Sequence, residues 1–472
     1  MQSDRRAVCG HMSSGGWCFK FPEVVVHLLM QDPAKNTGDG NGEDSLVVVH
    51  LSDFHFGDDP FNKRFDERRA GFYGHDYAFA LALREGLLQA AADAGVRYRD
   101  LRVVVSGDLT KCGTARQLTF ANKFLHGTMR DPLATLTAIS QPFGLDLEKM
   151  TGHRAVVIPG NHDHWAGELP TPWWKQETYQ PGAFSGEFGT VPWDVPKRLS
   201  SSGGGIVLEL LGLDSNSGLS WGATNSQAGG EVSQEHLLRL TGFAKAPPDG
   251  TTLDRLPDGS LPVVVRWLLI HHDFGHRSFA SFFSGEFQPK PLRSDSREAV
   301  LLKLRTHSIA MVLTGHQHIA SAQRHVGGRL TELRAPAATA GQALNQVGLS
   351  RAEARLRAQL AGLGFGLAHN PNREGQETIP VNRCGFWVHT LRRAAPASQP
   401  AQGRRVVCES RLYLWLGTVF RRVELRQHYL WSTGASAIVS ELPVIAAAGE
   451  PPVGPPVPEV VVPRTGVKPP TP

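Results

Sequence analysis

The chain has 472 residues, of which 41% are apolar and 20% charged, and this composition excludes a mostly disordered protein. Its 49 basic and 44 acidic residues leave a formal charge of +5, which is too small for this length to predict a nucleic-acid binder. Five cysteines argue against a disulfide framework, and no apolar run approaches the ~18 residues that span a bilayer. We therefore expect a cytoplasmic globular protein without a membrane span, and its oligomeric state stays open.

The two ends of the chain differ from its body. Residues 1–44 contain a polar stretch rich in Gly, Asn and Asp and have no convincing secretory signal, so we expect a flexible leader. Residues 443–472 are expected to form a disordered, proline-rich tail, because proline supports neither helix nor central strand. Residues 45–436 between them are expected to form a single domain with insertions.

The body predicts strands and helices in alternation. The apolar, β-branched run 46–51 predicts a buried strand, and the Ala/Leu-rich segment 77–94, followed by Gly95, predicts a helix. Further buried strands are predicted at 101–105, 154–158, 206–213, 263–270 and 309–313, with helices at 233–240 and 295–306. Buried rather than alternating strands between helices indicate an α/β fold with a parallel component.

The pattern weakens after residue 320. We expect a helix at 350–362 and strands at 386–391, 406–407 and 419–425. Three long connections, at 56–76, 111–152 and 164–204, exceed the usual loop of ~4–6 residues and are interpreted as functional loops or insertions.

Polar side chains follow the ends of the predicted strands. In chain order they are Asp53, His55, Asp108, Asn161, His162, His271, His272, His316 and His318. In open α/β sheets this edge is where ligands bind. A buried strand that runs into Gly-Asn-His-Asp would bury several polar groups without partners unless a ligand were present. His316 and His318, two residues apart, point to the same side of an extended segment.

These residue types suit a pair of metal ions. Imidazole, carboxylate and amide oxygen are ligands of Mn, Fe, Zn or Co, and the lack of a thiolate pattern argues against a structural zinc or iron–sulfur site. A carboxylate can bridge two cations ~3.5–4 Å apart. Two divalent or mixed-valence ions would lower the pKa of a shared water and neutralise a phosphate ester, so that a bridging hydroxide can attack phosphorus.

The motifs Asp53-x-His55, Gly107-Asp108, Gly160-Asn161-His162-Asp163, His271 and Gly315-His316-x-His318 resemble, in this order, the five blocks of the calcineurin-like metallophosphoesterases. The resemblance implies a four-layer α/β/β/α sandwich with loop insertions. It also implies a role for each motif residue: Asp53, His55 and His318 on the first metal, Asp108 bridging both, and Asn161, His271 and His316 on the second.

Two further histidines receive roles from the same resemblance. His162 would contact the phosphate and act as general acid, or as electrostatic stabiliser, for the leaving oxygen. His271 is preferred as ligand because it follows the strand directly, and His272 is the alternative ligand or a substrate contact.

The sub-class is suggested by weaker motifs. Gly107-Asp108-Leu109-Thr110 and Leu213-Asp214-Ser215-Asn216 resemble the bacterial class III cyclic-nucleotide phosphodiesterases. Lys111 stands where purple acid phosphatases would have a tyrosine ligand. We therefore expect a phosphodiesterase acting on a small or nucleotide-like phosphate ester. The alternatives are a phosphomonoesterase or nuclease of the same fold, or a non-catalytic scaffold; no predicted basic groove supports nucleic acid.

Overall fold

The computed structural model describes residues 44–56, 74–75, 77–111, 113–127, 129–130, 142–164, 183–218, 229–245, 256–257, 259, 261–275, 291–305, 309–318, 320–325, 330–341, 376–378, 384–393, 404–416, 419–433 and 438–441. All of these belong to one compact unit, which Asp44–Pro472 form. The helix predicted at 350–362, the leader and the proline-rich tail lie outside the described residues.

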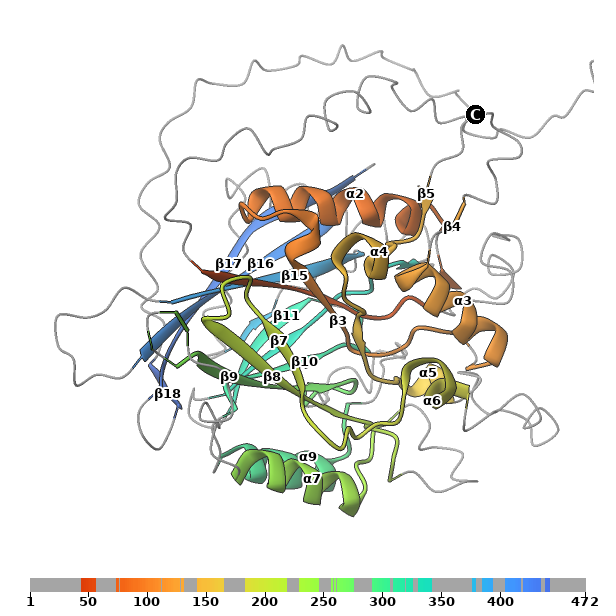
Figure 1. The fold of residues 1–472 in the computed structure, drawn as a ribbon. Helices are drawn as coiled ribbons and strands as arrows, with labels where there is room; N and C mark the ends of the chain where they lie inside the picture. The colour runs from red at the N-terminus through yellow and green to blue at the C-terminus, as the bar shows by residue number, and fades with distance from the viewer. Residues whose placement is uncertain are drawn as a thin grey trace, which may run out of the picture. The chain divides into compact units, whose positions relative to one another are not determined.

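The first sheet has seven strands in the order β18-β17-β16-β15-β1-β3-β6 (Figure 1). Their bounds are β1 (Ser45–Leu51), β3 (Leu101–Val105), β6 (Val156–Val157), β15 (Gly385–Arg393), β16 (Arg404–Leu416), β17 (Val419–Thr433) and β18 (Ile438–Glu441). β1, β3 and β6 are parallel, so their carboxyl ends share an edge, while β15 to β18 extend the other side of the sheet as antiparallel neighbours.

The second sheet also has seven strands, in the order β14-β11-β12-β10-β9-β8-β7. Their bounds are β7 (Lys197–Ser200), β8 (Ile206–Leu213), β9 (Val263–Ile270), β10 (Met311–Thr314), β11 (Ser321–His325), β12 (Leu330–Arg334) and β14 (Gln376–Thr378). The central four strands, β8 to β10 and β12, are parallel, so a second set of carboxyl ends shares an edge. Two short pairs, β2 (Gly74–His75) with β13 (Ala340–Gly341) and β4 (Met129–Arg130) with β5 (Pro142–Phe143), stand apart from both sheets.

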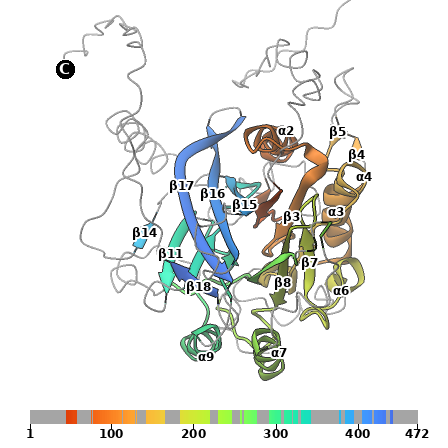
Figure 2. The same cartoon turned by 60° about the vertical axis from the view of Figure 1, so that its left-hand side comes forward.

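The helices lie on the outer faces of the two sheets. α2 (Tyr77–Asp93), α3 (Ala115–His126) and α4 (Leu147–Thr151) lie beside the first sheet, whereas α7 (Gln234–Lys245) and α9 (Ser294–Arg305) lie beside the second (Figures 1 and 2). Short segments complete the chain: η3 (Tyr98–Asp100), α5 (Asn161–His164) and α6 (Ala183–Phe188).

Three apolar clusters hold the layers together. Successive residues of β1 alternate between two of them: Val48 belongs to the cluster between the sheets that also contains Trp267 and Leu313, whereas Val47 and Val49 belong to the cluster that contains residues of α2 and α3. A third cluster joins the second sheet to α7 and α9. The expected four-layer α/β/β/α sandwich is therefore confirmed.

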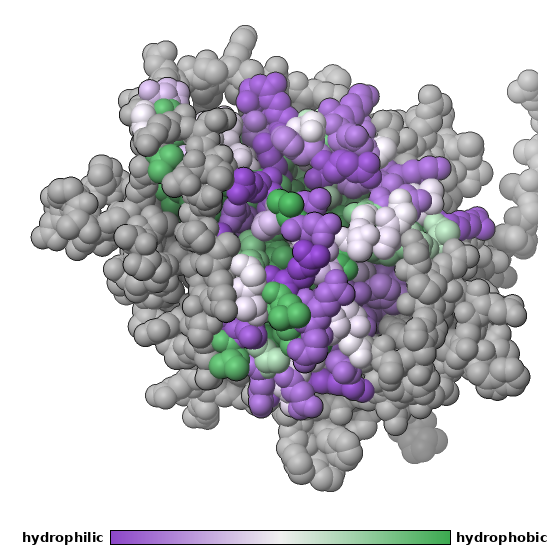
Figure 3. Space-filling model, turned by 60° about the horizontal axis from the view of Figure 1, so that its bottom comes forward, coloured by the Kyte–Doolittle hydropathy of each residue, from purple (hydrophilic) through white to green (hydrophobic). Residues whose placement is uncertain are grey.

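On the side of α7 and α9, the described surface residues are mostly hydrophilic, with scattered apolar groups (Figure 3). Leu238 on α7 and Leu302 on α9 are exposed, and isolated apolar side chains of this kind are normal on a folded protein. Among the described residues, no helix combines the length and the apolar character needed to cross a bilayer.

Most predicted elements are present, but the antiparallel strands were predicted too short. The apolar runs predict strands at 406–407 and 419–425, whereas β16 and β17 contain 13 and 15 residues. In β16, Val406, Cys408 and Leu412 are buried between the sheets, while polar residues such as Glu409 and Arg411 alternate with them. Alternation of this kind is typical of a strand with one buried face, and a search for continuous apolar runs misses it.

Two fully buried histidines lie in the layer between the sheets. The Nε2 atom of His50 is 2.9 Å from the hydroxyl of Ser106, and the Nδ1 atom of His389 is 2.7 Å from the hydroxyl of Ser410. Their ring centroids are 6.1 Å apart. Burial disfavours the charged imidazolium, and it lowers the pKa of His50 to about 3 and that of His389 well below its ordinary value.

Acid should therefore destabilise the fold through His50. The unfolded chain binds the extra proton near pH 6.5 and the folded chain only near pH 3, so stability falls as the pH drops between these values, by up to about 1.4 kcal/mol per pH unit for this group. We expect His50→Asn to give a shallower decline between pH 6 and 4 than the wild type, measured by urea unfolding in EDTA. His153→Asn is the control: burial lowers the pKa of His153 as well, but its side chain is exposed, so we expect this variant to change the slope less than His50→Asn does. Parallel profiles for His50→Asn and wild type would contradict this assignment.

Candidate metal centre

The loops after β1 and β3 pair through their backbones and so place their polar side chains together. Asp53 N donates to Gly107 O at 3.0 Å, and the N–H groups of Phe54 and His55 both donate to Asp108 O, at 2.8 and 3.0 Å. A bridge between Phe56 and Thr110 extends this pairing past the strand ends. The main chains that carry Asp53, His55 and Asp108 are consequently held in register with one another.

Two glycines of the motifs are required because neighbouring atoms occupy the space that a Cβ would need. Gly107 has φ of +104°, and a Cβ there would collide with the backbone of Gly160 and the ring of His271. A Cβ on Gly160 would collide with the Asp108 carboxylate. Glycine at both positions lets the loops after β3 and β6 come into direct contact beneath the polar cluster.

Asp53, His55 and His318 form one corner of the cluster. The Nε2 atoms of His55 and His318 are 3.0 Å apart, and His318 Nε2 is 3.2 Å from Asp53 Oδ1. The other carboxylate oxygen, Asp53 Oδ2, accepts a hydrogen bond from the backbone N–H of His316 at 3.1 Å. All three side chains are buried, and their ligand atoms lie close enough together to hold a metal ion.

Asn161, His271 and His316 form the opposite corner. Asn161 Oδ1 is 3.1 Å from both His271 Nε2 and His316 Nδ1. His271 Nδ1 lies 2.7 Å from the carbonyl oxygen of Ser106, and because a carbonyl only accepts, Nδ1 must carry the proton. In neutral His271 the lone pair is therefore on Nε2, which faces Asn161.

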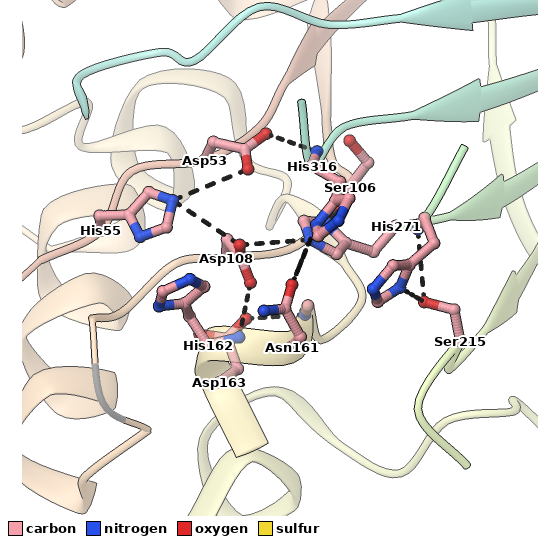
Figure 4. A network of polar contacts seen from close by, with 12 residues as sticks. Asp53, His55, Ser106, Asp108, Asn161, His162, Asp163, Ser215, His271 and His316 are labelled. Atoms are coloured by element: carbon pink, nitrogen blue, oxygen red, sulfur yellow. Dashed lines mark hydrogen bonds and ion pairs between the residues drawn. The ribbon is translucent and has the colours of Figure 1, made fainter. Parts of the chain in front are cut away.

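Asp108 lies between the two corners. Its Oδ2 atom is 3.2 Å from His271 Nε2 and 3.6 Å from His55 Nε2, whereas its Oδ1 accepts the backbone N–H of His162 at 2.8 Å. One oxygen is thus held by the main chain, and the other is directed to the middle of the cluster. Figure 4 shows Asp53, His55, Asp108, Asn161, His271 and His316 turned toward this common region.

This arrangement fits cations. Around His271 Nε2, the carboxylate of Asp108, the amide oxygen of Asn161 and the imidazole lone pair all present electron pairs to one region, and only positive charge there makes the contacts favourable. Burial alone would lower the pKa of His271, but the Asp108 carboxylate beside it raises that pKa to about 9. The same demand for positive charge would be met by a metal ion.

The cluster is also where the backbone is strained. Non-glycine residues with positive φ include Asp53 (56°), His55 (53°), Asp108 (51°), His316 (74°) and His318 (56°). Non-glycine residues adopt this left-handed conformation at a cost, and such outliers gather at functional sites. The strain therefore singles out the same residues as the side-chain geometry does.

His162 is half-buried at the margin of the cluster. One of its ring nitrogens lies within 4.8 Å of ligand atoms of His55 and Asp108, and its ring meets that of His55 edge to face at a centroid distance of 4.5 Å. Its Nδ1 is 3.1 Å from the carbonyl oxygen of Lys111. As at His271, the carbonyl accepts, so Nδ1 of His162 carries a proton.

His272 does not share the position of its neighbour His271. Its Nδ1 is 2.7 Å from the hydroxyl of Ser215, and its ring lies 4.2 Å from that of His316. The side chain is fully buried. The geometry thus brings His271 to Asp108 and Asn161, and it places the ring of His272 beside that of His316.

Asp163 is a supporting residue to which the sequence analysis gave no role. Its Oδ1 accepts the N–H and the hydroxyl of Thr110, both at 2.9 Å, and its Oδ2 accepts the N–H groups of Leu109 at 3.2 Å and Gly160 at 2.9 Å. These four hydrogen bonds join the loops that carry Asp108 and Asn161. Its place in the Gly-Asn-His-Asp motif was the signal that could have identified it.

His164 and Asp214 form a further pair at the strand ends. The Nε2 atom of His164 is 2.9 Å from Asp214 Oδ2, which links the end of α5 to the loop after β8. Trp193, in the segment between α6 and β7, is buried and belongs to the apolar cluster between the sheets.

A comparison with models of protein families agrees with this geometry. A family model described as calcineurin-like phosphoesterase matches residues 46–320, and a search of curated proteins finds no match. The solved structures with a similar chain path include GAP50, the anchor in the inner membrane complex of Plasmodium (8% identity, TM-score 0.40, covering 82% of this chain and 90% of that one). A dimetal phosphatase from Danio rerio (13% identity, TM-score 0.38, covering 82% of this chain and 99% of that one) and the phosphopantetheinyl hydrolase of Mycobacterium tuberculosis (13% identity, TM-score 0.27, covering 62% and 90%) are also similar.

The family model spans more than half of this chain. The chain therefore belongs to the calcineurin-like phosphoesterases, a family of metal-dependent phosphoester hydrolases.

Proposed function

We propose that this protein is a dinuclear metal-dependent phosphodiesterase that acts on a small or nucleotide-like phosphate ester. The observation that carries the proposal is the convergence of buried imidazole nitrogens on Asp53, Asp108 and Asn161 at the shared edge of the two sheets. The full set of ligand types is present and in contact, so a non-catalytic scaffold is not favoured.

Each side chain then has a defined task. Asp53, His55 and His318 would hold one ion, Asn161, His271 and His316 the other, and Asp108 Oδ2 would contact both. Mn, Fe, Zn and Co all suit these oxygen and nitrogen donors. When bound, two such ions lower the pKa of a water molecule and offset the negative charge of the ester.

The protein supplies orientation and a low-dielectric surrounding. The carbonyl oxygen of Ser106 fixes the tautomer of His271, and the backbone N–H of His162 fixes one oxygen of Asp108, so neither ligand must reorganise during the reaction. The site's carboxylates are almost completely buried, and in this setting each charge interaction is stronger than in water.

His162 would contact the phosphate and protonate the departing oxygen. Its Nδ1 is occupied by the Lys111 carbonyl, so Nε2 is the nitrogen that would exchange a proton with the leaving group.

The preference for a diester is supported by sequence resemblance. Gly107-Asp108-Leu109-Thr110 and Leu213-Asp214-Ser215-Asn216 resemble bacterial cyclic-nucleotide phosphodiesterases. The test is a screen with Mn²⁺ of bis(4-nitrophenyl) phosphate, 4-nitrophenyl phosphate, cyclic nucleotides and single-stranded DNA. Faster diester hydrolysis supports the proposal. Activity on monoesters alone indicates a phosphatase, salt-sensitive cleavage of DNA indicates a nuclease, and two bound ions without turnover on any ester indicate a scaffold.

Replacement of the proposed acid should separate chemistry from metal binding. We expect His162→Ala to lower kcat by about 10²–10⁴-fold for an ester with an alkoxide leaving group, and by less for a nitrophenyl ester, which departs without a proton. Metal content should stay at the wild-type level. His153→Ala, at an exposed histidine, is the matched control and should leave kcat unchanged. An unaltered rate for His162→Ala on the alkyl ester would exclude the acid role.

The carboxylate between the two corners should control both ions. Asp108→Asn removes its negative charge at similar size, so we expect the affinity for Mn²⁺ to fall by at least about 10-fold and hydrolysis to fall with it. Metal analysis after equilibrium dialysis measures the loss. Asp100→Asn, at a carboxylate that pairs with Arg97 near β3, is the control and should bind metal like the wild type. Retention of both ions by Asp108→Asn would show that Asp108 is not a shared ligand.

A further inference from the structure

Three polar side chains beside the metal centre hydrogen-bond one another in a closed ring. Arg334 donates from Nη2 to Asp273 Oδ1 at 2.7 Å and from Nη1 to Gln317 Oε1 at 2.8 Å. Gln317 Nε2 in turn donates to Asp273 Oδ2 at 2.7 Å. Asp273 is fully buried and Arg334 nearly so. Each bond uses different atoms, so the three interactions coexist without competition.

The ring joins three segments that carry or support the proposed ligands. Asp273 follows His271 by two residues, and Gln317 stands between His316 and His318. Arg334 ends β12, which pairs in parallel with β10, the strand that leads into the two histidines. The ring therefore ties the loop of His271 to the turn of His316 and His318.

The turn that contains His316 and His318 is strained, so contacts must hold it in place. His316 and His318 have φ of 74° and 56°, and both are in the left-handed region that side chains disfavour. At the start of the turn, the backbone N–H of Gly315 donates a hydrogen bond to His271 O at 2.9 Å. In the middle of the turn, between the two strained residues, the Gln317 side chain hydrogen-bonds to Asp273 and Arg334.

We propose that Asp273, Gln317 and Arg334 are positioning residues that set the separation of the two ion sites and so allow both ions to bind at once. The inference rests on the proposed function, since it concerns the same pair of ions. His316 and His318 would bind different ions, and Gln317 is the residue between them in the chain. Without its partners the turn is free to leave the left-handed conformation, and the rings then move away from Asn161 and His55.

Gln317→Met tests the proposal directly, because methionine has a similar length and can neither donate nor accept these hydrogen bonds. The readout is binding rather than turnover: Mn²⁺ per chain and its dissociation constants, from equilibrium dialysis of the full chain. We expect wild type to bind two ions and Gln317→Met to bind the weaker one about 10–100-fold less tightly. Arg334→Lys keeps the charge but loses one arm of the fork, and we expect a smaller loss of the same ion.

A matched control separates positioning from general stability. Arg266 on β9 is also buried, with Nε 2.9 Å from Glu209 Oε2 and Nη1 donating to Phe243 O at 3.1 Å. Arg266→Lys should lower the melting temperature of the metal-free protein about as much as Arg334→Lys does, yet leave both dissociation constants unchanged.

Two results would overturn the inference: unchanged Mn²⁺ constants in Gln317→Met and Arg334→Lys, or an equal loss of metal in Arg266→Lys. Failure of the proposed function has a different signature, since the wild type itself would then bind no ions or hydrolyse no phosphate ester.

Discussion

The structure depends on how two buried carboxylates are compensated. Asp53 and Asp108 are 0% and 1% exposed, and an unpaired charge so deeply buried costs several kcal/mol. Burial alone would raise the pKa of each carboxyl, but the histidines beside them hold both pKa values well below the usual range. The ionised carboxylates in turn require positive charge nearby. Each loop that enters this region brings imidazole nitrogens or N–H groups, so the fold is arranged around a demand for cations.

The backbone that carries these side chains is strained. Five residues of the cluster have positive φ, and at about 1–3 kcal/mol each the strain is of the same order as the 5–15 kcal/mol that stabilises a typical domain. Such conformations persist only where the surroundings over-determine them. Asp163 does this for the loops after β3 and β6 with four accepted hydrogen bonds, and Gln317 does so for the turn after β10. The supporting residues are therefore as much a part of the site as those that face it.

The sequence allowed prediction of the parts that follow from local pattern. Apolar runs located β1, β3, β8 and β9, and polar residues directly after them located the cluster, because the ends of parallel strands share an edge. Alternating strands such as β16 were predicted too short, since their apolar residues are not consecutive. The ring of Asp273, Gln317 and Arg334 could not be predicted, because its members lie up to 61 residues apart and pair only through the register of β10 with β12.

The core between the sheets and the metal centre meet at Ser106. Its hydroxyl is 2.9 Å from Nε2 of the buried His50, and its carbonyl oxygen accepts a hydrogen bond from His271 Nδ1–H at 2.7 Å. The side chain of this residue thus belongs to the core, and its main chain fixes the tautomer of a proposed ligand. A movement of Ser106 would therefore change both contacts at once. The packing of the sandwich and the geometry of the proposed ligand at its edge are therefore linked through the atoms of one residue.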